Sequence, residues 1–124
     1  MAKLMYIEKE LTTEYRPWGY FTVLEEKENY KVKKLVVNSH QRLSLQLHHH
    51  RDEQWIVVEG KALLICDNNF TEYSAGESTS IPRGSLHRIE NKSDSQVVII
   101  EIQNGEYLGE DDIVRFEDDY SRIN

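Results

Sequence analysis

Four side chains that can bind a metal fall into two short segments of the sequence. The first segment holds Gln46, His48 and Glu53, and the second holds His87. Two imidazole nitrogens, one carboxylate oxygen and one amide oxygen suit zinc, manganese, iron or cobalt. A nitrogen and oxygen site without cysteine is typical of catalytic metal centres, which keep a coordination position open. The two segments therefore predict one divalent metal site formed by these four residues.

Both segments resemble the two characteristic motifs of the cupin superfamily. The usual first motif is G-x5-H-x-H-x3,4-E-x6-G; in this chain it ends at Gly60, with His40 in place of the first glycine and Gln46 in place of the first histidine. The second motif, G-x5-P-x-G-x2-H-x3-N, matches at every named position from Gly76 to Asn91. The resemblance implies an all-β cupin fold, which is a double-stranded β-helix or jelly-roll barrel.

Several further segments narrow the resemblance, namely Arg16-Pro17-Trp18-Gly19, Arg42-Leu43-Ser44-Leu45-Gln46, His48-His49-His50-Arg51, Ile81-Pro82, His87-Arg88 and the tail from Tyr107 to Tyr120. Together they resemble the type II mannose-6-phosphate isomerase domain, which also has glutamine at the position of Gln46. That domain usually forms the C-terminal part of a bifunctional mannose-1-phosphate guanylyltransferase. The resemblance implies metal-dependent interconversion of mannose 6-phosphate and fructose 6-phosphate through an enediolate.

The residues leave other functions open. A cupin that only binds a sugar or a metal, and signals through a partner, would keep the same pocket without turnover, because a fold does not fix a function. A nucleotide-sugar epimerase or ketoisomerase is another alternative, although it needs a larger cleft with an aromatic side chain against the base. A dioxygenase is disfavoured because Gln46 replaces a histidine. A simpler alternative to the metal site is an exposed histidine tract at 48–50 with His87 capping a loop.

The implied isomerisation moves a proton between two carbons, so a base must lie within hydrogen-bonding reach of them. Glu101 and His50 are the candidates, because strand alternation places both on the side that faces the cavity. The alternatives are an ion pair of Glu101 with Lys33 or Arg88, and a rim hydrogen bond for His50. The metal, zinc first and manganese, cobalt, nickel or iron after it, would stabilise the negative charge that forms on the sugar oxygens.

A phosphorylated sugar also requires positive charge, and the candidates for binding its phosphate are Arg42, Arg51, Lys33 and Arg88. Arginine suits phosphate because its planar fork donates two parallel hydrogen bonds. Arg42 belongs to the same alternating row as Gln46 and His48, whereas Arg88 points away from His87 and ranks below the others. The alternative is that these cations pair with the many surface carboxylates of the chain.

Length and charge limit the classes of function. The 124 residues suffice for one domain, 1–124, and we expect no guanylyltransferase activity, because that domain is several-fold larger and no Gly-rich phosphate loop is present. The net charge of −7 argues against a nucleic-acid partner. The chain has a single cysteine, Cys66, and no signal peptide or apolar run of membrane-spanning length. These features predict a cytoplasmic protein without membrane attachment.

Short segments rich in Val, Ile, Leu and Tyr alternate with turn residues, which predicts a sandwich or barrel. The predicted strands are 20–25, 30–38, 43–50, 54–59, 61–67, 70–74, 78–81, 87–91 and 96–103. We expect a loose arm or added dimer strand at 1–12, and a C-terminal lid at 107–124 with a short helix at 111–116. Leu43, Leu45 and Leu47 face away from the metal side, which predicts a homodimer.

Overall fold

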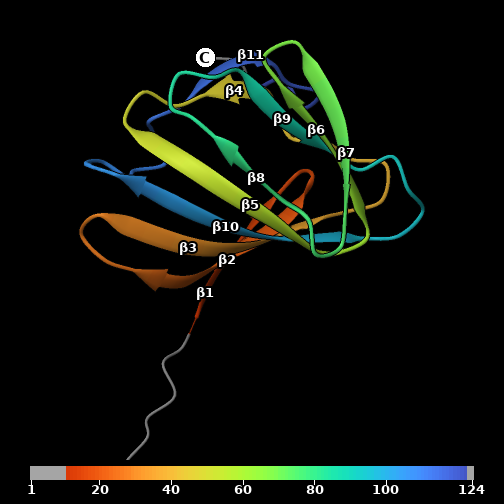
Figure 1. Ribbon diagram of the computed structural model, residues 1–124, viewed down its shortest axis with the longest axis horizontal. Coiled ribbons are helices and arrows are strands. Elements are labelled where there is room, and N and C mark those ends of the chain that lie inside the picture. The colour runs from red at the N-terminus through yellow and green to blue at the C-terminus, as the bar shows by residue number, and fades with distance from the viewer. Residues whose placement is uncertain (1–10, 123–124) are drawn as a thin grey trace, which may run out of the picture.

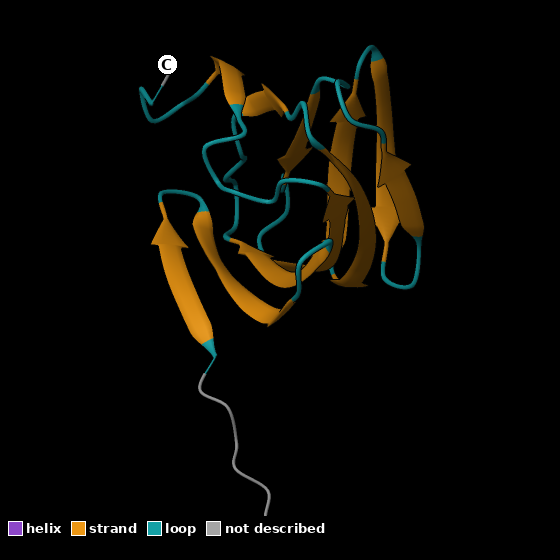
Figure 2. Cartoon of the chain, turned by 90° about the vertical axis from the view of Figure 1, so that its left-hand side faces the viewer, coloured by secondary structure: helices purple, strands orange, loops and turns teal. Residues whose placement is uncertain are grey.

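The computed structural model describes residues 11–122, and every regular element in that part of the chain is a β-strand (Figure 1). One sheet has the strand order β1 (Thr12–Arg16), β2 (Gly19–Glu26), β3 (Tyr30–Val37), β10 (Val97–Gly105), β5 (Arg51–Glu59) and β8 (Ser78–Ile81). The other has the order β11 (Val114–Glu117), β4 (Leu45–Leu47), β9 (His87–Glu90), β6 (Lys61–Cys66) and β7 (Asn69–Ser74). The two sheets face each other (Figure 2).

Alternating side chains on the central strands build the core between the sheets. Trp55 and Val57 on β5 point inward, as does Ile99 on the neighbouring strand β10. Ile89 on β9 packs against them from the opposite sheet. The intervening residue Ile56 is 40% exposed on the outer face. A period of two is the pattern of a strand with one buried face, and the all-β prediction is confirmed.

The inward rows change from apolar to charged along the same strands. On β10, Ile99 is followed on the inner face by Glu101, and on β5, Trp55 is preceded by Glu53; all four are buried. The strand register also aligns Glu101 with Lys33 of β3, which is buried as well. Buried charges must be paired or bound to a ligand, so this polar end of the barrel is where a functional site is expected.

The predicted helix at residues 111–116 is wrong. The amide of Asp112 donates to the carbonyl of Gly109 over 3.1 Å, which closes a turn that leads into β11. Strand β11 then pairs with β4 at the edge of the second sheet. Ile113 and Val114 are β-branched, and a helix of this length is marginal without tertiary support, so pairing with the open edge of β4 prevails.

The remaining strand predictions agree with the structure except at the edges. Strands β1 and β11 fall outside the predicted set, and the predicted strand 43–50 shrinks to Leu45–Leu47 because the chain turns at 48–50.

Most of the predicted arm at 1–12 lies outside the described residues. Leu43 packs against the core, so the leucine row is only partly on the outer face, and the homodimer stays a prediction. Within residues 11–122, no helix is long and apolar enough to cross a membrane.

Replacing Ile99 with alanine is expected to lower the free energy of unfolding by about 2–4 kcal/mol, because truncating a side chain that is only 1% exposed leaves a cavity. The control Ile56→Ala changes the same side chain on the outer face, where 40% is exposed, and is expected to lower it by less than about 1.5 kcal/mol. Urea unfolding followed by circular dichroism measures both values. Equal losses would contradict the assignment of inner and outer faces.

Candidate metal centre

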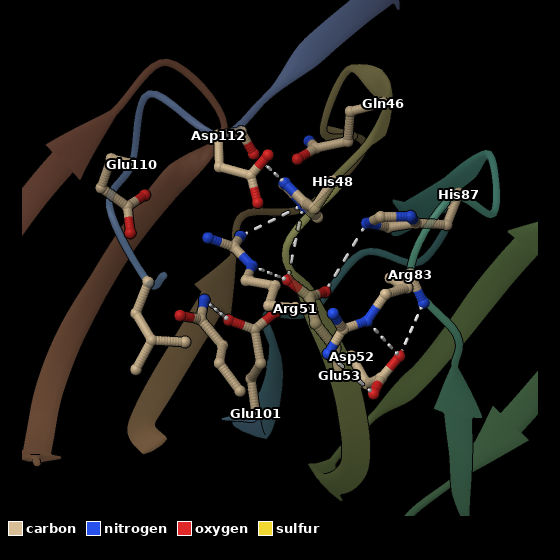
Figure 3. A network of polar contacts seen from close by, with 12 residues as sticks. Gln46, His48, Arg51, Asp52, Glu53, Arg83, His87, Glu101, Glu110 and Asp112 are labelled. Atoms are coloured by element: carbon tan, nitrogen blue, oxygen red, sulfur yellow. Dashed lines mark hydrogen bonds and ion pairs between the residues drawn. The ribbon is translucent and has the colours of Figure 1, made fainter. Parts of the chain in front are cut away.

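Three of the four predicted metal ligands meet at the polar end of the barrel. His48 directly follows β4, Glu53 lies on β5, and His87 begins β9. One ligand atom from each lies within 4.8 Å of the other two, and the three residues are 2–3% exposed. Figure 3 shows both imidazole rings directed at the Glu53 carboxylate. Two segments that are distant in sequence therefore bring two nitrogen donors and one oxygen donor together in a buried cluster.

Hydrogen bonds fix both imidazole rings in the orientation that metal binding requires. The Nδ1 atom of His48 lies 2.5 Å from the Asp112 carbonyl oxygen, and Nδ1 of His87 lies 2.9 Å from the Ser85 carbonyl oxygen. A carbonyl only accepts, so each Nδ1 carries the proton and each Nε2 keeps a lone pair. Burial lowers the pKa of His48 to about 4 and also lowers the pKa of His87, so both rings are neutral at pH 7.

The two lone pairs face a carboxylate at close range. Nε2 of His48 is 3.4 Å from one oxygen of Glu53, and Nε2 of His87 is 3.6 Å from the other. With both rings neutral no proton lies along these contacts, and Oε1 of Glu53 is buried without a hydrogen-bond partner. Three electron-rich atoms converging in this way repel one another unless a cation lies between them. The donor set therefore fits a divalent metal ion.

Gln46 lies beside this cluster rather than inside it. It is on β4, in register with His87, and lines the same cavity. Its amide nitrogen donates to the Ser44 hydroxyl over 3.1 Å and lies 3.3 Å from the Ser44 carbonyl oxygen. These contacts occupy the amide nitrogen of Gln46, so its amide oxygen is the atom that can reach a metal. The structure thus places the fourth predicted ligand next to the other three.

The C-terminal segment supports the first histidine. Besides accepting from His48 through its carbonyl, Asp112 accepts through its carboxylate from the amides of His49, at 3.0 Å, and His50, at 2.9 Å. One residue of the tail therefore fixes both the ring of His48 and the turn that follows it. Sequence reasoning missed this role, because an acidic residue in an acidic tail gives no local signal for it.

Arg51 contacts two of the candidate metal ligands directly. Its side chain is 5% exposed, and its Nε donates to Glu53 over 2.8 Å. A terminal nitrogen lies 3.1 Å from Nε2 of His48. The guanidinium thus neutralises the charge of Glu53 from the side opposite His87, as Figure 3 shows. The sequence predicts a phosphate ligand at Arg51; the structure shows it paired with Glu53, and its role toward phosphate stays a prediction.

Glu101, one of the two predicted bases, lies deep in the same cavity. Its carboxylate accepts from the indole nitrogen of Trp55 and from the amide of Gln103, both over 2.8 Å. Burial raises the pKa of this carboxyl group, and the neighbouring Glu53 carboxylate raises it further. The alternative ion pairs of Glu101 with Lys33 or Arg88 are not among the contacts of the described residues.

His50 does not reach the cavity. Its side chain is 53% exposed and lies 3.2 Å from Glu106. The expectation that it shares a face with Gln46 and His48 is wrong, because β4 ends at Leu47 and the chain turns before β5 begins. Strand alternation cannot be extended through that turn. His50 therefore lies at the rim of the barrel.

The other predicted phosphate ligands are divided between the cavity and the surface. Arg42 is 35% exposed and forms a bidentate pair with Asp119, outside the cavity lining. Arg88 is buried, lines the cavity and donates to the Leu43 carbonyl over 2.8 Å. Lys33 also lines the cavity, where it pairs with Glu110 at 2.6 Å. The Asp119 carboxylate of the C-terminal tail holds the Arg42 side chain outside the cavity.

Three further arginines line this cavity and escaped sequence reasoning: Arg16, Arg115 and Arg122. The cavity has a volume of about 70 Å³. Arg115 has a buried Nε without a hydrogen-bond partner, and burial and the nearby Arg122 lower the pKa of its guanidinium. A signal was available, since Arg115 alternates with Val114 and Phe116 in a strand-like pattern.

Comparisons with known proteins agree with this geometry. Residues 6–118 match the family described as "Mannose-6-phosphate isomerase C-terminal". The chain is 48% identical over 110 residues to the alginate biosynthesis protein AlgA of Pseudomonas syringae, covering 89% of this chain and 23% of AlgA. It is 42% identical over 109 residues to the mannose-1-phosphate guanylyltransferase ManC of Salmonella typhimurium, covering 88% of this chain and 23% of ManC. The chain thus spans about a quarter of the length of these relatives.

A solved structure supports the fold. A Klebsiella pneumoniae protein with a double-stranded β-helix domain superposes with a TM-score of 0.68 at 20% identity, covering 77% of this chain and 82% of that chain. This likeness, with the two facing antiparallel sheets, confirms the cupin double-stranded β-helix predicted from the two motifs. It bears on the architecture alone and not on the chemistry.

The same comparisons correct one expectation. The prediction that the protein lacks guanylyltransferase activity is wrong, because relatives that share this region are named mannose-1-phosphate guanylyltransferases. The matched region covers only 22–24% of the relatives compared, so it gives no ground for denying that activity. The family match over residues 6–118, the sequence identity and the His/Glu cluster agree with one another. The chain belongs to the mannose-6-phosphate isomerase C-terminal family and has the cupin fold.

Proposed function

We propose that the protein is a metal-dependent aldose–ketose isomerase that interconverts mannose 6-phosphate and fructose 6-phosphate. The observation that carries the proposal is the convergence of two imidazole lone pairs on Glu53, in a cavity that also holds a buried carboxyl group. The family match supports the choice of substrate. The relatives in alginate and mannose-1-phosphate metabolism are consistent with a role in supplying activated mannose.

His48, Glu53 and His87 would hold the metal, with the Gln46 amide oxygen beside them. Zinc is our first choice, because two imidazoles and a carboxylate are a common ligand set for catalytic zinc. When bound, the ion would polarise the sugar oxygens and stabilise the negative charge of the enediolate. The Asp112 and Ser85 carbonyls keep the two imidazoles in the tautomer that binds metal, so the protein positions these ligands in advance.

Glu101 would move the proton between C1 and C2. Its raised pKa brings the carboxyl group closer to the operating pH, where a general base is most effective. Hydrogen bonds from Trp55 and Gln103 hold the carboxylate in one orientation on the cavity wall. His50 is exposed at the rim and is the weaker candidate for this step.

The arginines at the cavity wall would bind the phosphate. Arg115 and Arg122 both line the cavity, where burial and the nearby Arg122 lower the pKa of Arg115. An anion placed against this pair would relieve both the repulsion and the unpartnered Nε of Arg115. Arg16 lines the same cavity. The sugar would then extend from these arginines toward the metal ligands.

Glu53→Gln is expected to abolish metal-dependent turnover, with a loss of at least about 100-fold in kcat, because the amide removes the only negative ligand of the ion. Glu59→Gln, the same change at an exposed position of β5, is expected to retain activity. The measurement is a coupled assay of fructose 6-phosphate formation with metal-stripped protein reloaded with zinc, manganese, cobalt, nickel or iron. Full activity of Glu53→Gln, or no turnover of the folded wild type with any metal, would contradict the proposal.

Glu101→Gln is expected to lower kcat by about 10²- to 10⁴-fold while the bound metal stays unchanged, because the amide keeps the shape and loses the base. Metal content by elemental analysis, together with exchange of the substrate C2 proton with solvent, separates the base from a structural role. The control Glu106→Gln alters an exposed carboxylate outside the cavity. Proton exchange at the wild-type rate in Glu101→Gln would show that another group is the base.

Arg115→Met is expected to raise KM for mannose 6-phosphate by roughly tenfold or more, since it removes a charge-assisted hydrogen bond to the phosphate. It is also expected to weaken inhibition by inorganic phosphate to a similar extent. Arg83→Met is the control, because Arg83 pairs with Asp52 and Glu106 on the surface. Unchanged phosphate inhibition in Arg115→Met would place the phosphate elsewhere.

A further inference from the structure

The position of Arg51 creates a conflict at His48. A terminal nitrogen of the guanidinium lies 3.1 Å from Nε2 of His48, while Nε donates to Glu53 over 2.8 Å (Figure 3). The other terminal nitrogen, Nη1, is buried without a hydrogen-bond partner. A planar guanidinium therefore bridges two of the metal ligands and keeps one of its donors unused.

This contact occupies the lone pair on Nε2 of His48. The Nδ1 proton of His48 is committed to the Asp112 carbonyl, so the remaining ring nitrogen, Nε2, is an acceptor with a single lone pair. Arg51 cannot be deprotonated under ordinary conditions, so it contacts Nε2 only as a donor. The same lone pair is the one that a metal would bind. Donation from Arg51 and metal coordination at His48 therefore exclude each other.

Glu53 does not impose the same exclusion. A carboxylate offers about four acceptor positions over its two oxygens. It can accept from Nε of Arg51 on Oε2 and still bind a metal through Oε1, which has no hydrogen-bond partner. The hydrogen bond from Nε of Arg51 to Glu53 can thus remain while the guanidinium rotates and its terminal nitrogens move away from His48. The cavity, which Arg51 also lines, is the space into which they would move.

We propose that Arg51 is a built-in competitor of the metal: its guanidinium supplies the positive charge between His48 and Glu53 until a metal takes the His48 lone pair. Metal binding then releases the terminal nitrogens of Arg51 into the cavity, where they meet an anionic group of the substrate. The inference rests on the metal centre of the proposed function. Arg51 would thus neutralise Glu53 and contact His48 before the metal binds, and contact the substrate afterwards.

The competition predicts the sign of a change in metal affinity. Metal-stripped Arg51→Met is expected to bind zinc about tenfold or more tightly than the wild type, because the metal no longer displaces a charge-assisted hydrogen bond. Titration against a chromophoric zinc chelator measures both dissociation constants. Arg88→Met is the matched control: Arg88 is equally buried on the same cavity but bonds Leu43 and Glu117 instead of a metal ligand. Its affinity is expected to change less than about threefold.

An unchanged or weaker zinc affinity in Arg51→Met would overturn the proposal, since it would make Arg51 a fixed support of Glu53. An equal gain in Arg88→Met would also overturn it, because loss of any nearby charge would then suffice. Failure of the wild type to bind zinc or another divalent metal would overturn the proposed metal centre together with this inference. Wild-type binding with an unaltered variant would overturn this inference alone.

A second measurement uses the wild type and does not depend on a variant that folds. Nitrogen-15 spectra of the arginine side chains report how fast the terminal protons of Arg51 exchange with solvent. Zinc addition is expected to speed this exchange by roughly tenfold, because the bond to His48 is lost and the nitrogens enter the open cavity. Exchange that stays the same or slows on zinc binding would overturn the proposal.

Discussion

The buried carboxylate of Glu53 is the constraint on which the rest of the site depends. It is 2% exposed, faces two neutral imidazoles at 3.4 and 3.6 Å, and has one oxygen without a hydrogen-bond partner. A carboxylate in such a place is strongly destabilising unless positive charge is close by. Arg51 supplies that charge from one side, and the geometry of His48 and His87 suits a metal from the other. In the proposed function, the chemistry of the cavity would follow from how Arg51 and a bound metal share the Glu53 carboxylate.

The cupin fold provides this arrangement by dividing each inward row of side chains into two parts. On β10 the row passes from Ile99 to Glu101, and on β5 it passes from Trp55 to Glu53, so the apolar half stabilises the barrel and the polar half forms the site. The antiparallel register places the two carboxyl groups on adjacent strands. Burial raises the pKa of Glu101 and the nearby Glu53 carboxylate raises it further, so the same packing would serve both the proposed metal site and the proposed base.

The sequence predicted the parts of this structure that depend on local spacing. His48, Glu53 and His87 belong to two short motifs that are visible in the chain, and strand periodicity placed Glu101 on the inner face. The pattern failed where the chain turns, as at His50, and where distant segments meet. Asp112 reaches His48 across 64 residues, and the position of Arg115 on β11 depends on pairing with β4. No local pattern contains such contacts, so only the folded structure shows them.

The anomalous scattering of zinc-loaded crystals, measured on both sides of the zinc absorption edge, tests the metal centre most directly. One anomalous peak per chain is expected, bonded to Nε2 of His48, Nε2 of His87 and a carboxylate oxygen of Glu53. The terminal nitrogens of Arg51 would lie away from His48 in the same map. A peak at the exposed histidines, such as His49 and His50, with none at Glu53, would contradict the central claim that this buried carboxylate is the anchor of a metal centre.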